Sequence, residues 1–326
     1  MDLLKTTFAG LNLKNPIIVS SSGLTNSAIK NKKLEEAGAG AIVLKSLFEE
    51  QILLEAGHLD SASIDSPESM DYLNQYVRSH HLNEFINLIK DTKESCTIPV
   101  IASINCYNNA EWTDFALKME EAGADALEIN ILAVQTNPKS TYGEFEQQHI
   151  DILKSIKEKV KLPVIVKLGS NLTNPIALIN QLYANGAAAV VLFNRFYQPD
   201  INIDTMEYTS GEVFSNPADL ATSLRWTGIA SATVDKLDYA ISGGVHDGNA
   251  VIKSILAGAT AVEVCSAIYQ NSNEIINTMK KTVETWMQKK GYQQIAQFKG
   301  LMNAKKIEGI NMFERTQFLR YFGTKE

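Results

Sequence analysis

The feature that most limits what this chain can fold into is a repeated way of starting a buried strand. In one pattern, Pro precedes an apolar run, at 15–20, 98–103 and 162–167. In the other, a helix ends in Gly and Ala before an apolar run, at 37–45, 122–130, 185–194 and 257–265. Pro prevents a helix from continuing into the strand, and Gly ends a helix in the left-handed conformation. With a strand at 236–244, the chain has eight units, each followed by a stretch with helical spacing.

Short apolar strands that alternate with helices predict a parallel sheet buried on both faces. Eight units indicate a closed α/β structure, the (β/α)8 TIM barrel, over a single domain of residues 1–326. The alternative is an open doubly wound sheet, which usually has a Gly-rich turn after its first strand, whereas this turn reads SSSG at 20–23.

Three further segments complete the predicted barrel. Residues 6–16 favour an N-terminal hairpin that closes the barrel bottom, and residues 272–326 favour a C-terminal helical extension. The connections at about 48–81 and at 195–215 are long, and extra length after a barrel strand lies on the catalytic face. We therefore expect both to form lids or substrate walls.

Charge and cysteine spacing limit the partners. The net charge is −7, which disfavours nucleic acid and anionic membranes. No apolar run approaches the roughly 18–20 residues that a membrane helix needs. Cys96, Cys106 and Cys265 are far apart and lack the spacing of a zinc site, so we expect no metal and a cytoplasmic protein.

Polar residues gather where the predicted strands end, which is where barrel enzymes place their chemistry. Buried lysines and asparagines are costly unless they are paired. A single lysine at a strand end often reaches solvent, but two lysines after apolar strands favour a site. The strand-end residues are Ser20, Ser21, Ser22, Gly23, Lys45, Ser46, Asn105, Asn130, Lys167 and Asn194.

The run at 241–267 predicts a phosphate site between the last two strands. Gly243 and Gly244 let backbone amides approach a ligand closely, the next helix offers a positive N-terminus, and Cys265 with Ser266 forms a second loop. Paired glycines also occur in plain tight turns, but barrel phosphate sites concentrate at these last units.

Together, these motifs resemble the dihydroorotate dehydrogenase family, the flavin-dependent barrels of pyrimidine synthesis. The resemblance spans almost the whole chain. It is carried by SSSG, LKS, EIN, VKL and FN after the first, second, fourth, fifth and sixth strands, and by the ending SGGV…G…ILAGATAVEV. The family has Gly-Thr where this chain has Cys265-Ser266, a change that backbone contacts tolerate.

The resemblance implies an FMN across the barrel mouth. Ser21, Ser22, Gly23, Lys45 and Ser46 would line the flavin, Asn130 and Lys167 would contact its ring, and Asn105 belongs to the same set. Gly243, Gly244, Cys265 and Ser266 would hold the phosphate through backbone amides. A β-branched residue at Gly244 is therefore expected to weaken FMN binding more than fold stability.

The substrate side departs from the family pattern. In the family, a Cys or Ser in the loop after the fourth strand removes a proton from the substrate, and in register that base falls on Ala133. Thr136, Tyr142 and Cys106 are the candidates for a relocated base. The substrate loop after the second strand, here 63–74, also matches poorly.

Lys45, Asn130, Asn194 and Arg195 are the candidate substrate-binding residues. Arg195 favours a small anionic substrate because a guanidinium can clamp a carboxylate, although a surface ion pair explains it equally well.

Three functions stay open. They are a dihydroorotate dehydrogenase with a relocated base, an FMN oxidoreductase with a different substrate, and a flavin-binding barrel without turnover. The family resemblance also suggests a homodimer. The sequence does not identify the electron acceptor.

Overall fold

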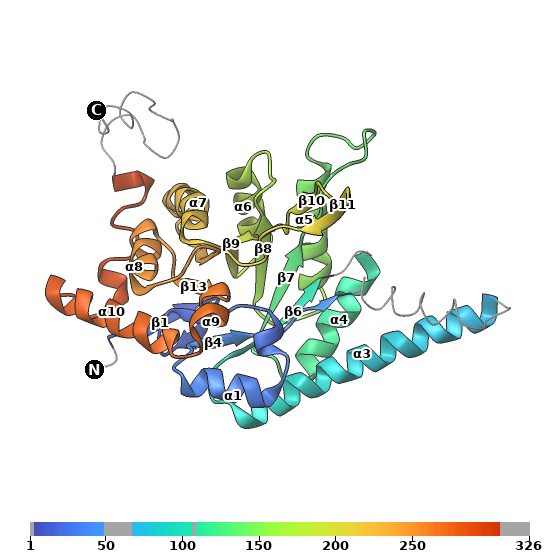
Figure 1. Ribbon diagram of the computed structural model, residues 1–326, viewed down its shortest axis with the longest axis horizontal. Coiled ribbons are helices and arrows are strands. Elements are labelled where there is room, and N and C mark those ends of the chain that lie inside the picture. Colours follow the sequence, from blue (N-terminus) through green and yellow to red (C-terminus); the bar gives the residue numbers. More distant parts are fainter. Residues whose placement is uncertain (1–2, 49–66, 106–108, 307–326) are drawn as a thin grey trace.

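Eight parallel strands form a closed barrel in the computed structural model, which describes residues 3–48, 67–105 and 109–306 (Figure 1). The barrel strands are β3 (Ile17–Val19), β4 (Ala41–Val43), β6 (Val100–Asn105), β7 (Ala126–Ile131), β8 (Val164–Gly169), β9 (Ala189–Asn194), β12 (Asp238–Ser242) and β13 (Ala261–Val264). Pairing of β13 with β3, and of β4 with both β3 and β6, closes the ring, and β5 (Leu47–Phe48) adds a short second contact to β6. The predicted TIM barrel is confirmed.

The glycines that precede the apolar runs end the helices and begin the turns into the next strands. Gly38, Gly123, Gly186 and Gly258 follow the ends of helices, and all four have positive φ values, between 90° and 116°. An L-residue with a side chain is strained in this conformation, so glycine ends each helix and turns the chain into the next strand. Each of these next strands is almost wholly buried, as expected for a sheet covered on both faces.

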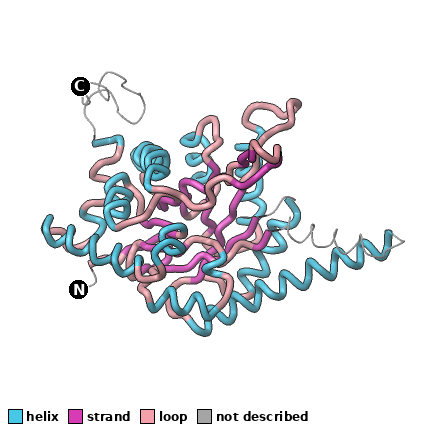
Figure 2. Tube along the Cα trace, viewed as in Figure 1, coloured by secondary structure: helices cyan, strands magenta, loops and turns pink. Residues whose placement is uncertain are grey.

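Helices surround the strands, so that the strands lie inside a ring of helices (Figure 2). After β3 the chain forms η1 (Gly23–Thr25) and α1 (Ala28–Glu36). The other helices between barrel strands are α3 (Pro67–Ser95), α4 (Asn109–Glu121), α5 (Glu144–Lys157), α6 (Pro175–Ala184), η2 (Pro217–Asp219), α7 (Leu220–Thr233) and α8 (Gly248–Ala257). Among the helices in the described ranges, none has both the length and the apolar character needed to cross a membrane.

The first long connection differs from the prediction. Residues 49–66 lie outside the described residues, but the second half of the expected lid belongs to α3, a helix of 29 residues. Val77, Leu82, Phe85 and Ile89 are buried in the main core, at spacings that place them on one face of the helix. Of these four residues, Val77 belongs to the expected lid, and the other three lie in the part of α3 that follows residue 81. The expected substrate loop at 63–74 lies partly outside the described residues and is helical from Pro67 onward.

The second long connection, 195–215, contains an antiparallel hairpin of β10 (Pro199–Asn202) and β11 (Glu207–Ser210). All eight strand residues are exposed. Tyr197, Val213 and Phe214, which flank the hairpin, line the cavity described below, so this segment supplies one wall of it, as predicted.

The predicted N-terminal hairpin is also present. Strands β1 (Thr6–Phe8) and β2 (Leu11–Leu13) pair antiparallel, and Phe8 and Leu13 are buried against the lower layer of the barrel interior. The amide of Ala9 donates to the Asp238 carboxylate at the start of β12. The hairpin therefore closes the bottom of the barrel.

After β13 the chain forms α9 (Ser266–Asn271). The predicted C-terminal extension, from residue 272, then contains α10 (Ile275–Lys290) and the short turns η3 (Ile295–Gln297) and η4 (Ala304–Lys306). Lys299 forms an ion pair with Asp238, at 3.4 Å. The extension is thus tied to the same end of the barrel as the hairpin, and its helical character up to residue 306 agrees with the prediction.

Candidate functional site

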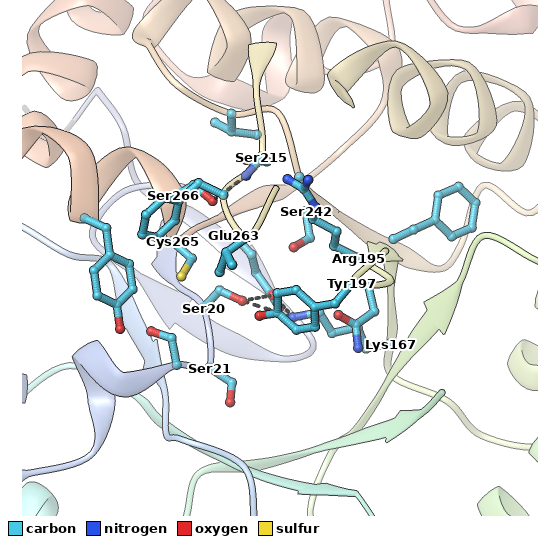
Figure 3. A pocket seen from close by; sticks show the side chains of 18 of the residues that line it. Ser20, Ser21, Lys167, Arg195, Tyr197, Ser215, Ser242, Glu263, Cys265 and Ser266 are labelled. Carbon is cyan, nitrogen blue, oxygen red and sulfur yellow. Dashed lines mark hydrogen bonds and ion pairs between the residues drawn. The ribbon is translucent and has the colours of Figure 1, made fainter. Parts of the chain in front are cut away.

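A cavity of about 500 Å³ lies at the carboxyl ends of the barrel strands (Figure 3). This volume is within the range of small-molecule and cofactor sites. Eleven of the predicted site residues line it: Ser21, Ser22, Gly23, Lys45, Lys167, Asn194, Arg195, Gly243, Gly244, Cys265 and Ser266. Ser46, Asn105 and Asn130 are not among its lining residues. The barrel therefore brings most of the predicted residues together from strands far apart in the sequence.

The predicted phosphate end is formed by two turns. Gly243 and Gly244 have φ values of 86° and 75°, a conformation that favours glycine. The N-terminus of α8 is already capped, because the Asp247 carboxylate accepts a hydrogen bond from the amide of Ala250. The N-terminus of α9 has no side-chain cap from Cys265. The uncapped helix end at the cavity thus belongs to α9 rather than to α8, which the sequence had favoured.

The two glycines differ in what surrounds them. A Cβ built on Gly243 would meet no atom within 4 Å, whereas one built on Gly244 would lie 2.1 Å from the backbone nitrogen of Leu220. A side chain at Gly244 would therefore collide with the start of α7. The geometry opposes the expectation that a substitution there mainly affects the ligand, because the required space is filled by protein backbone.

Ser46 has a supporting position behind the cavity wall. Its hydroxyl contacts the Ser21 hydroxyl at 2.9 Å and the Ser103 hydroxyl at 2.7 Å, and its amide donates to Ser21 Oγ. This chain of hydroxyls joins the ends of β3, β4 and β6 and fixes Ser21, which lines the cavity.

Lys167 is buried at the floor of the cavity among acidic partners. Its Nζ lies 2.5 Å from Glu263 Oε2 and 3.6 Å from Glu128 Oε1, and it donates to Ser20 Oγ at 3.0 Å. Burial acts to lower the pKa of Lys167, but the two carboxyl groups outweigh it and raise the pKa above its ordinary value. Lys167 therefore stays positively charged, and buried acidic side chains of the protein already balance that charge.

The two predicted asparagines on β7 and β9 meet each other. Asn194 Nδ2 donates to Asn130 Oδ1 at 2.8 Å, across the end of β8. Asn194 lines the cavity and Asn130 is not among its lining residues, so the hydrogen bond lets Asn130 fix the orientation of the Asn194 amide.

Arg195 lies at the cavity and also forms the ion pair that was its alternative explanation, while its role toward a substrate stays a prediction. Its guanidinium lines the cavity, yet it also donates to the Asp219 carboxylate at 3.3 Å and to the carbonyl of Glu212 at 2.9 Å. An arginine has five N–H donors, so these two contacts leave others for a ligand.

The candidates for a proton acceptor do not gather at the cavity. Ala133 is half-buried, and its carbonyl accepts a hydrogen bond from Asn171 at 2.9 Å. Thr136 and Tyr142 are exposed, and neither lines the cavity. Cys106 lies outside the described residues. Burial raises the pKa of the Cys265 thiol, so this cavity-lining cysteine is protonated at neutral pH.

The sequence reasoning missed several lining residues, above all Glu263 and Tyr269. Glu263 had a visible signal, since it is the charged residue within the apolar run of β13. Tyr269, on α9, packs against Phe214 with ring centroids 5.4 Å apart. Its contact partner lies 55 positions earlier in the chain, and no local pattern indicates that pairing.

The fold and this cavity define a (β/α)8 barrel with a ligand site at the carboxyl ends of its strands, the arrangement of barrel enzymes. A sequence model of the family described as dihydroorotate dehydrogenase matches residues 3–287. The chain belongs to the dihydroorotate dehydrogenase family.

Curated relatives agree with this assignment. The chain is 29% identical over 317 residues to a protein of Thermoplasma volcanium, an alignment that covers 92% of this chain and 99% of the relative. It is 31% identical over 280 residues to a protein of Methanocella arvoryzae, covering 80% and 86%. It is 26% identical over 287 residues to one of Methanocaldococcus jannaschii, covering 84% and 90%. All three carry the name dihydroorotate dehydrogenase B (NAD(+)), catalytic subunit.

Proposed function

We propose that this protein is an FMN-dependent oxidoreductase acting on a CH–CH bond of dihydroorotate or a related small anionic substrate. The observation that carries the proposal is one cavity that joins the Gly243–Gly244 turn to Lys167 and Lys45. A turn that could hold a phosphate, and two lysines of which Lys167 is paired with Glu263, line one cavity and suit a flavin mononucleotide, and the family membership supports the same reading.

The residues of the cavity fit an FMN. The space beside Gly243, where a Cβ would meet no atom within 4 Å, and the start of α9, which the Cys265 side chain does not cap, would accept the phosphate. Lys45 and Lys167 would lie toward the ring. When bound, the FMN supplies the hydride acceptor, whereas the protein binds and orients the reactants.

The substrate would be held by the polar wall of the same cavity. The Asn194 amide, fixed by Asn130, offers a hydrogen-bonding edge, and Arg195 and Lys45 offer positive charge to a carboxylate. These groups carry the proposal of a small anionic substrate.

Proton removal is the step at which this chain departs from the family pattern, because position 133 carries the methyl group of Ala133 where the family has a Cys or Ser base. A general base contributes about 10²–10⁴-fold to rate, so its loss slows flavin reduction without abolishing it. The second candidate function, a flavin barrel that uses another substrate or none, follows from the same residue.

The first experiment is purification followed by an absorbance spectrum and release of the bound cofactor. We expect non-covalent FMN. A colourless protein that also fails to bind added FMN would remove the cofactor and the proposed activity.

The second experiment is anaerobic mixing with dihydroorotate, with flavin bleaching as the readout. We expect slow reduction of the wild type, and faster reduction of Ala133→Cys with a pH dependence set by a thiol, whose free pKa is about 8.5. Ala133→Val is the matched control, since it adds volume without a proton acceptor. Fast wild-type reduction would show that a base exists elsewhere. No reduction of either form, with FMN bound and reducible by dithionite, would favour the second candidate function.

The homodimer suggested by the family resemblance stays a prediction, to be tested by analytical ultracentrifugation. The relatives are named as NAD(+)-dependent catalytic subunits, which supports testing NAD(+) as the electron acceptor for the reduced protein.

A further inference from the structure

Three ionisable side chains meet beneath the cavity floor. Glu128 on β7, Lys167 on β8 and Glu263 on β13 are 1%, 4% and 2% exposed. Lys167 Nζ lies 2.5 Å from Glu263 and 3.6 Å from Glu128. Two buried carboxyl groups therefore face one ammonium group. If all three groups were ionised, the cluster would keep one negative charge that nothing within it neutralises.

The two carboxyl groups have unequal partners. Glu263 Oε2 accepts hydrogen bonds from Lys167 and, at 2.8 Å, from the Ser20 hydroxyl. In the described part of the chain, neither side-chain oxygen of Glu128 finds a donor. An ionised carboxylate buried without donors is costly, so the proton belongs on Glu128.

A proton on Glu128 also removes the repulsion between the two acids. Two ionised carboxylates beside one ammonium group repel each other, whereas a neutral Glu128 leaves Glu263 as the counterion of Lys167. Burial and then the charge of Glu263 raise the pKa of Glu128 well above its usual range. Burial opposes ionisation of Glu263 too, but the charge of Lys167 and the hydrogen bonds from Lys167 and Ser20 lower its pKa. Among the described residues, the Cys265 thiol also acts on Lys167.

We propose that Glu128 is a neutral acid under the cavity and that ionised Glu263 cancels the charge that Lys167 would otherwise present to the bound flavin. This inference rests on the proposed function for its flavin part only. The reduced flavin ring gains negative charge, which an uncancelled cation stabilises. The pair of acids is thus a positioning and tuning device that makes the bound flavin harder to reduce.

The proposal predicts that Glu128 becomes the counterion of Lys167 when Glu263 is removed. In Glu263→Gln, Lys167 loses its nearest counterion, and Glu128, already 3.6 Å away, should release its proton and take that place. In Glu128→Gln, a neutral amide replaces a neutral acid of similar shape. The double variant leaves Lys167 without a carboxylate in this cluster.

Infrared difference spectra of the apoprotein test the charge state without any flavin. The carbonyl band of a protonated carboxylic acid should be present in the wild type and absent from both Glu128→Gln and Glu263→Gln. A wild type without this band, or a band that survives Glu128→Gln, would overturn the proposal. Strong destabilisation of Glu128→Gln would overturn it as well, because only an ionised Glu128 would lose an ion pair on that change.

The flavin reduction potential tests the tuning. Glu128→Gln should leave it unchanged, and Glu128→Gln/Glu263→Gln should favour the reduced flavin by about tenfold or more, which is about 30 mV for a two-electron couple. An unchanged potential in the double variant would refute the tuning role. A protein that binds no FMN would refute the proposed function but would not change the infrared result. Failure of the proposed function can therefore be distinguished from failure of the charge assignment.

Discussion

Alanine substitutions at Gly243 and Gly244 should separate what the fold needs from what the cavity needs. Both residues have left-handed backbone, with φ values of 86° and 75°, so alanine costs about 1–2 kcal/mol at either position. At Gly243 the new Cβ would meet no atom within 4 Å. At Gly244 it would lie 2.1 Å from the backbone nitrogen of Leu220, and α7 would have to move.

The difference between the two variants follows from that collision. Forcing a group into a packed site costs about 1–3 kcal/mol, so Gly244→Ala should lose about 2–5 kcal/mol in total and Gly243→Ala only about 1–2 kcal/mol. In a domain of this size, 1 kcal/mol corresponds to roughly 2–4 °C in Tm. The two variants share the cost of the left-handed backbone and differ by the collision of about 1–3 kcal/mol, so Gly244→Ala should melt roughly 2–12 °C below Gly243→Ala.

Thermal unfolding of the two apoproteins, followed by circular dichroism, measures this difference, and FMN titration completes the assay. Gly243→Ala should weaken FMN binding while keeping most of its stability, because its methyl group faces the open cavity. Equal Tm values for the two variants would refute the role assigned to the Leu220 backbone. Full FMN affinity in Gly243→Ala would show that the phosphate lies elsewhere.

Three further substitutions test the packing and the charges. Lys167→Ala should destabilise the protein by about 3–5 kcal/mol in thermal unfolding, because Glu263 is left buried without its cation, and a loss below about 1 kcal/mol would contradict the buried ion pair. Burial acts to raise the pKa of Glu35 on α1, but hydrogen bonds from Lys32 and Thr97 lower this pKa to about 2. The stability that ionised Glu35 adds is therefore present above its unfolded pKa of about 4.3 and is lost as the pH falls toward 2. Glu35→Gln should flatten urea-measured stability over that window, and an unchanged pH profile would refute the assignment. Ile89→Ala, fully buried on α3, should cost about 2–5 kcal/mol, against less than about 0.5 kcal/mol for the exposed control Lys90→Ala, and similar losses in both would show that α3 does not pack as described.

The barrel could be predicted from the sequence because its signals are local. Gly38 and Gly123 end helices through their own backbone conformation, and Pro before a strand acts on its immediate neighbours. The lid expected at 48–81 was inferred from length alone. Its described part is helical from Pro67 onward and continues into the stretch whose Leu82, Phe85 and Ile89 pack into the core. Residues 49–66 lie outside the described residues, so the lid itself stays a prediction.

The composition of the cavity was predictable residue by residue, but its contacts were not. Lys167 was expected to face a ligand, yet it is held by Glu263, which lies 96 positions later in the chain. Gly244 was expected to approach a phosphate, yet its missing side chain makes room for Leu220. Both depend on which strands and helices become neighbours in the barrel, and a single sequence contains no direct record of that.

The closure of the barrel also determines when the cavity can exist during folding. The hydrogen bond between Ser20 and Glu263 spans 243 positions, and it joins the first barrel strand to the last. Contacts of such long sequence separation form late, because the chain must first lose a large amount of loop entropy. Ser21 and Ser266, on opposite sides of this seam, both line the cavity. Recovery of flavin binding after dilution from denaturant is therefore expected to follow the slowest refolding phase, and to report directly on the meeting of the two ends of the sheet.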